Sequence, residues 1–185
     1  MRKYIFLITF LTLLLAGCSK RMATLSHFPK ENFPQAWVGN WSGELLIYDA
    51  NGVKQKVPMA LEIQPTAKND VFTWALIYGE DKEKGRRSYE LNIKDAEKGW
   101  YAIDEKNSII LDCYLFHNKL YSRFEVMGNL LLCTYEKQGD QIIFEVISGN
   151  QHAVSNSGGE KHNGEDIPEV KAFGINVSQK AILTK

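Results

Sequence analysis

The stretch WSGELLIYDANGVKQKVPMALEIQ, residues 41–64, contains two β-like runs joined by a tight turn. One face of residues 54–64 carries apolar side chains at every second position: Val57, Met59, Leu61 and Ile63. A spacing of two is typical of a β-strand with one buried face. Asn51-Gly52 between the runs is a preferred hairpin turn. The stretch therefore predicts an antiparallel hairpin.

Similar runs continue along the chain, separated by turn residues at intervals of roughly ten. Ten segments are predicted as strands: 41–49, 54–64, 71–78, 88–94, 100–104, 109–115, 120–126, 130–135, 142–147 and 171–183. Most connections are too short for a parallel crossover, so neighbouring strands must be antiparallel. Closure of such a sheet removes its two exposed edges. We expect an all-β fold, an up-and-down antiparallel β-barrel of these ten strands; a two-sheet sandwich is the alternative.

The segment between the last two predicted strands differs from the rest of the chain. Ser148 to Glu169 is rich in Gly, Asn, Ser and charged residues. This composition predicts a mobile loop before the closing strand.

The N-terminus carries a targeting pattern. Arg2 and Lys3 precede an apolar run from Ile5 to Leu15, and small residues follow. This order is typical of a secretory signal peptide, and the run is shorter than the ~20 residues that span a bilayer. Leu15-Ala16-Gly17-Cys18 resembles the lipobox of bacterial lipoproteins, which implies lipidation of Cys18 and cleavage before it. An ordinary signal peptide followed by a chance cysteine is the alternative.

These features divide the chain into a signal peptide (1–17), a lipidated tether (18–36) and a β-barrel domain (37–185). The expected location is the cell envelope, with the membrane reached through the lipid anchor. Ser19 follows the lipidated cysteine, and the resemblance to lipoproteins then implies outer-membrane sorting if the organism is Gram-negative.

Gly39-Asn40-Trp41 at the start of the first strand, together with Lys180 near the C-terminus, resembles the lipocalin and wider calycin pattern. The resemblance implies that Gly39, Trp41 and Lys180 close one end of the barrel. A cation over an indole face gains about 0.5–2 kcal/mol. The alternative is that Trp41 is ordinary core and Lys180 an ordinary surface charge.

A barrel of ten strands has a wider interior than one of eight, so a ligand could enter it. The candidate ligand-binding residues are aromatic: Trp74, Tyr78, Trp100 and Phe124. The alternative is that these side chains simply fill the interior.

Other chemistry lacks a recognisable motif. The four histidines do not have metal-ligand spacing, and neither a nucleophile elbow nor a phosphate-binding loop is present. We therefore expect no cofactor, no metal site and no enzymatic activity. The balance of 22 basic and 22 acidic residues disfavours nucleic acid as a partner. Cys113 and Cys133 are expected as free thiols, with a disulfide as the alternative.

The sequence thus predicts a membrane-anchored lipoprotein whose lipocalin-like barrel binds a small apolar or amphipathic ligand. The alternative is a protein-interaction module, such as an inhibitor or an envelope assembly accessory, that acts through loops such as residues 80–87. The sequence does not identify a protein partner.

Overall fold

The computed structural model describes residues 32–185, so the signal sequence and Cys18 lie outside the described residues. Apart from one turn of 3-10 helix (Gln35–Trp37) and the short helix α1 (Lys82–Gly85), the regular elements are strands. They are β1 (Gly39–Asp49), β2 (Gly52–Pro65), β3 (Val71–Tyr78), β4 (Arg86–Asp95), β5 (Trp100–Asp104), β6 (Ile110–Phe116), β7 (Lys119–Val126), β8 (Asn129–Gln138), β9 (Gln141–Asn150), β10 (Ala153–Ser157), β11 (Lys161–His162), β12 (Glu165–Asp166), β13 (Val170–Phe173) and β14 (Val177–Thr184).

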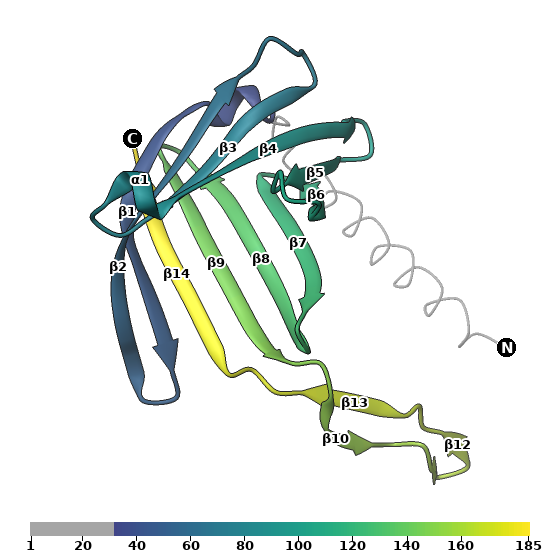
Figure 1. The fold of residues 1–185 in the computed structure, drawn as a ribbon. Helices are drawn as coiled ribbons and strands as arrows, with labels where there is room; N and C mark the ends of the chain where they lie inside the picture. The colour runs from purple at the N-terminus through teal and green to yellow at the C-terminus, as the bar shows by residue number, and fades with distance from the viewer. Residues whose placement is uncertain (1–31) are drawn as a thin grey trace, which may run out of the picture.

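Ten of these strands form a closed antiparallel barrel (Figure 1). β1 to β9 follow one another around the wall, and β14 fills the gap between β9 and β1. Trp41 pairs with Leu61 on β2, and Leu45 on the same strand pairs with Ala181 on β14. This pairing on both sides of β1 confirms the predicted up-and-down antiparallel barrel and excludes the sandwich.

Side chains alternate between the inside and the outside of the wall, as the period of two requires. The inward positions form one continuous core that includes Trp41, Leu61, Trp74, Leu91, Tyr101, Leu120, Ile142 and Leu183. Each of these side chains is at most 1 % exposed. The inward side of β2 carries Met59, Leu61 and Ile63, which belong to the apolar face that the spacing in residues 54–64 indicates.

The barrel has two different ends. β1 and β3 begin at one end, where β6 and β14 finish, and the chain enters there through Phe33; we call this the plugged end. At the other end β3 and β7 finish and β6 begins; we call this the mouth. Among residues 32–185 no helix is long and apolar enough to span a bilayer.

The segment predicted as a mobile loop, Ser148 to Glu169, is instead largely β-structure. β9 continues to Asn150, β10 then pairs with β13, and β11 pairs with β12. The predicted last strand, 171–183, is correspondingly two strands, β13 and β14. Together residues 151–173 form an exposed two-stranded arm that projects from the mouth (Figure 1).

The tip of this arm explains the error. Asn163 and Gly164 have φ angles of 52° and 86°, the left-handed conformation that a tight hairpin turn requires. Asn-Gly is the same turn signal that marks residues 51 and 52. Polar composition concealed it here because the arm buries no apolar face.

The barrel plug and a candidate ligand cavity

The plugged end is filled by aromatic side chains from the segment that precedes β1. The ring of Phe33 packs edge-on against Trp37 and Tyr101, with centroids 4.8 Å away in both cases. Trp37 is fully buried and accepts a hydrogen bond through its carbonyl from Trp41 Nε1, at 2.9 Å. The segment assigned to the tether thus contributes Phe33 and its neighbours to the plug.

Trp41 occupies the predicted closing position, but its cation is a different lysine. Lys185 Nζ lies 4.7 Å from the centroid of the Trp41 ring. Lys180 instead points outward, where its Nζ lies 3.0 Å from Glu145 Oε1. The expectation for Lys180 is therefore corrected: Ala181 and Leu183 are buried inward positions, so alternation places residue 180 outside.

Gly39 has a specific role beside this contact. A Cβ atom at position 39 would lie only 2.8 Å from Lys185 Cε. The absence of a side chain lets Lys185 cross the end of the barrel and reach Trp41. The three positions Gly39, Trp41 and Lys185 thus form one closing contact.

The mouth half of the interior is not filled. A cavity of about 220 Å³ opens between inward side chains of most of the strands. Its lining is Leu76, Tyr78, Tyr89, Ile103, Glu105, Leu111, Ser122, Phe124, Leu131, Cys133, Tyr135, Phe144, Val146 and Gln179. The lining is mainly aliphatic and aromatic, with a few hydrogen-bonding groups, which is the usual composition of a small-molecule site.

The four candidate ligand-binding residues lie in three different environments. Tyr78 and Phe124 line the cavity. Trp74 is fully buried between the plug and the cavity, with its ring 6.5 Å from Trp37 and 5.1 Å from Tyr135. Trp100 is on the outside of the wall, where its Nε1 donates a hydrogen bond to Asp112 Oδ1 at 2.9 Å. Its neighbour Tyr101 takes the inward position, so Trp100 is excluded from the cavity.

Sequence reasoning did not select several of the polar lining residues: Tyr135 contributes a hydroxyl group, Cys133 a thiol and Gln179 an amide. The hydroxyl of Tyr89 also lines the cavity, as its alternation with the inward residues Leu91 and Ile93 indicates. Glu105 could not have been found this way because it follows the end of β5.

The tyrosine hydroxyls and the thiol in the cavity are protonated at neutral pH. Burial raises the pKa of Tyr78 and of Tyr135 well above the ordinary tyrosine value. Burial also raises the pKa of the Cys133 thiol to about 12. Glu105 is the one charged residue in the lining. It adds to the effect of burial in raising the pKa of Tyr89.

The indole N–H of Trp74 is buried beside the cavity and meets no acceptor in good hydrogen-bond geometry among the described residues. It interacts with the side chain of Tyr135 and partly opposes the rise in the pKa of that tyrosine. Cys113 and Cys133 are free thiols, as predicted. Within residues 32–185 no group of three or more His, Cys, Asp or Glu side chains is placed to hold a metal ion.

Comparison with known proteins identifies the fold alone. No protein family and no curated protein sequence matches this chain. A DUF3598-family protein of unknown function from Nostoc punctiforme superimposes with a TM-score of 0.53 at 12 % identity, over 80 % of this chain and 47 % of its own. The chain therefore spans about half of that protein.

The second similar structure is the S-type phycobiliprotein lyase CPES from Guillardia theta. Its TM-score is 0.50 at 9 % identity, over 80 % of this chain and 87 % of its own. A lyase thus uses this barrel. The prediction that the protein is not an enzyme is therefore corrected, because a barrel without recognisable catalytic motifs can still serve catalysis.

Proposed function

We propose that this protein is a lipid-anchored protein of the cell envelope that binds a small, mainly apolar ligand in the mouth cavity. The observation that carries the proposal is the unfilled, open interior beside a completely filled plug. Well-packed interiors leave few voids larger than a water molecule. A cavity of about 220 Å³ is therefore a feature that packing alone does not explain.

The lining restricts the chemistry of the ligand. The aliphatic and aromatic walls favour an apolar body, since burial gains about 25 cal/mol per Å² of apolar surface. The hydroxyls of Tyr78 and Tyr135 can donate hydrogen bonds to a neutral acceptor such as a carbonyl or a hydroxyl oxygen. The lining itself holds no cation, and an unpaired buried charge is strongly unfavourable. Arg87, the register partner of Leu76, lies beside the lining. From there its charge acts on Tyr78 and Tyr89.

The volume restricts the size of the ligand. Sites for drug-sized molecules are roughly 300–1,000 Å³, so this cavity encloses a smaller molecule or part of a larger one. A ligand longer than the cavity would extend through the mouth past Glu105.

Titration with 1-naphthol tests the cavity, because this probe joins an apolar ring to a neutral hydroxyl and its fluorescence reports binding. We expect saturable binding that Leu131→Trp abolishes, since residue 131 lines the cavity. Leu132→Trp is the matched control, because the adjacent position on β8 faces outward. Equal affinity in the two variants, or no saturable binding to the unaltered protein, would refute the cavity as a binding site.

The lipid anchor is tested separately by labelling growing cells with an alkynyl palmitate analogue. The resemblance of residues 15–18 to a lipobox supports lipidation at Cys18. We expect a labelled mature protein that begins at Cys18, and loss of the label in Cys18→Ala. A mature N-terminus at any other residue would exclude the anchor.

Binding of a protein partner is a second candidate function, and the arm favours it over the loop at residues 80–87. That loop forms the capped helix α1, at whose start the Asp81 carboxylate accepts hydrogen bonds from the backbone N–H groups of Glu83 and Lys84. The arm and its base instead expose Val154 and Ile175 by 70 % and 64 %. If a partner binds there, Val154→Ser with Ile175→Ser will reduce the size of the complex that a mild detergent extracts. An unchanged size would leave this function without support.

A further inference from the structure

The outer wall carries an exposed group of aromatic side chains near the plugged end. Trp100 on β5, Tyr114 on β6 and Tyr121 on β7 are register partners across three neighbouring strands. Phe116 lies beside them, its ring 6.0 Å from Tyr121. Trp100, Tyr114 and Phe116 are exposed by 39 %, 45 % and 64 %. We call these four residues the aromatic face.

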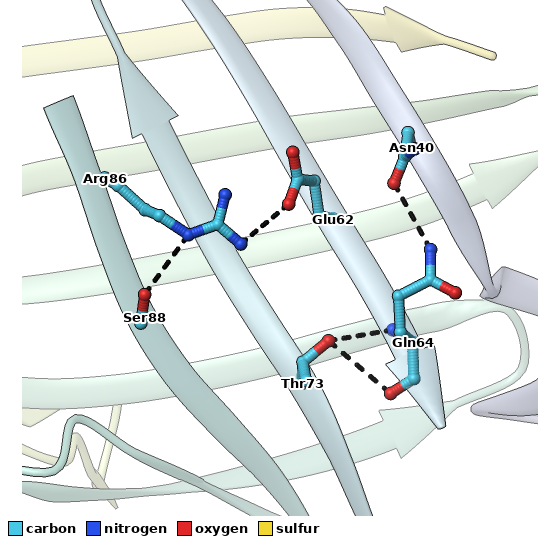
Figure 2. Close-up of polar contacts among 6 residues, drawn as sticks. All are labelled: Asn40, Glu62, Gln64, Thr73, Arg86 and Ser88. Carbon is cyan, nitrogen blue, oxygen red and sulfur yellow. Dashed lines mark hydrogen bonds and ion pairs between the residues drawn. The ribbon is translucent and has the colours of Figure 1, made fainter. Parts of the chain in front are cut away.

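The adjoining part of the outer wall shows that this composition is not general. On β1 to β4 outward positions form polar contacts between strands, drawn in Figure 2. Arg86 Nη2 donates to Glu62 Oε2 at 2.7 Å, and Gln64 Nε2 donates to Asn40 Oδ1 at 3.2 Å. Clustered exposed apolar side chains are characteristic of interaction sites.

The aromatic face lies beside the point where the chain enters the barrel. Trp100 begins β5 and Phe116 ends β6, both at the plugged end. The ring of Phe33, at the start of the described chain, is 4.8 Å from that of Tyr101, which follows Trp100. Asn32 follows Cys18 by 14 positions, so the extended chain between them reaches at most about 50 Å. A lipid on Cys18 would therefore keep this end of the barrel within that distance of the bilayer.

The chemistry of the face suits the membrane–water interface. Trp and Tyr concentrate there because each combines an apolar ring with a polar group. Ion pairs border the rings: Lys119 Nζ lies 5.7 Å from the centroid of Tyr121 and 3.1 Å from Glu136 Oε2, and Lys98 Nζ in the neighbouring turn lies 2.7 Å from Asp95 Oδ2. The aliphatic stems of such lysines can lie along an apolar surface while their charged ends stay in the polar layer.

We propose that the aromatic face lies against the lipid surface, so that the mouth and the arm point away from it. This inference rests on the proposed lipid anchor. The lipid then supplies affinity, and the aromatic face determines the orientation of the barrel. Membrane contact by the domain itself was not predicted from the sequence, which contains no amphipathic or basic segment for it.

Trp100 provides a direct probe, because the other three tryptophans, Trp37, Trp41 and Trp74, are at most 1 % exposed. The mature protein is reconstituted in phosphatidylcholine vesicles with and without nitroxide-labelled lipid. We expect vesicles to protect Trp100 from acrylamide and nitroxide lipid to quench it. The matched control is Ile175→Trp in a Trp100→Phe background, which moves the exposed tryptophan to the base of the arm. Its acrylamide quenching should be the same with and without vesicles.

A second measurement concerns affinity. Trp100→Ser with Phe116→Ser should lower vesicle partitioning of the mature protein at least about tenfold if these rings enter the interface. Mass spectrometry of the same sample shows whether Cys18 carries lipid, so failure of the anchor is recognised independently. Vesicle-bound, lipidated protein with Trp100 fully accessible to acrylamide would overturn the inference. Protection of Trp100 without vesicles, with a doubled mass in light scattering, would assign the face to a second copy and also overturn it.

Discussion

The two ends of the barrel are built from the same ten strands, yet one is solid and the other is hollow. At the plugged end Phe33 and Trp37, from the segment before β1, fill the space between the strands. At the mouth no segment of residues 32–185 enters, and a cavity of about 220 Å³ remains. Strand alternation thus decides which side chains face inward, whereas segments outside the strands decide whether the interior is full.

The largest expected effect concerns the tryptophan that closes the plugged end. Trp41→Ala should lower the free energy of unfolding by about 3–5 kcal/mol, since it removes a buried ring and leaves a cavity. Trp100→Ala is the matched control on the outer wall and should cost below about 1 kcal/mol. Urea midpoints measure both changes. An unmoved midpoint for Trp41→Ala would mean that this end is not closed by the plug.

Replacing a leucine by the larger tryptophan tests how much free space surrounds it in each half of the barrel. Leu61, which is fully buried and pairs with Trp41, has no space for a larger ring, so Leu61→Trp should cost about 1–3 kcal/mol through overpacking. Leu131→Trp should change stability by less than about 1 kcal/mol, because the new ring enters the cavity. Urea unfolding of the two variants compares them, and equal losses would show that the mouth is as tightly packed as the plug.

The closing lysine gives a smaller effect. Lys185→Ala should cost about 0.5–1 kcal/mol, because it removes the cation over the Trp41 ring. Lys180→Ala removes an exposed ion pair with Glu145 and should cost no more than a few tenths of a kcal/mol. Thermal unfolding at low and high salt separates the two. A larger loss in Lys180→Ala would restore the closing role predicted for it from the sequence.

The sequence was sufficient to predict the barrel because its alternation and short turns leave few other topologies. The same alternation, applied strictly, also places two misassigned residues. Tyr101 and Ile103 face inward, so Trp100 must face outward, and Ala181 facing inward places Lys180 outside. A motif based on residue type near the C-terminus did not distinguish Lys180 from Lys185.

The remaining features depend on contacts between distant segments. No local pattern shows that Phe33 would reach Tyr101 and fill one end. The size of the cavity depends on how far the segment around Phe33 fills the interior and on how the lining side chains pack. The arm depends on local turn chemistry, and Asn163-Gly164 was the signal that could have predicted it.

The smallest expected effect is the difference in labelling rate between the two cysteines. Burial raises the pKa of Cys113 to about 11 and that of Cys133 to about 12, above the roughly 8.5 of a free thiol. The pKa values alone predict faster alkylation of Cys113, because a one-unit lower pKa gives this thiol about ten times more thiolate. Access favours Cys133, which lines the open cavity, whereas Cys113 is fully buried. We expect Cys113 to react only in molecules that have unfolded. If the free energy of unfolding is about 5 kcal/mol or more, fewer than one molecule in a thousand exposes it.

We therefore expect iodoacetamide to label Cys133 before Cys113 in the folded protein, because access outweighs the pKa difference. The rate at Cys133 should rise about tenfold per pH unit beyond pH 9, where a free thiol has levelled off, since its pKa is raised rather than lowered. Cys113→Ser should preserve this slow reaction, and Cys133→Ser should remove it. A bound ligand should slow it further, because the ligand and the reagent enter through the same mouth. Cys113 is the register partner of Tyr101, which contacts the plug. Faster labelling of Cys113 would mean that the plugged end opens more readily than the mouth admits small molecules, which would reverse the contrast between the two ends.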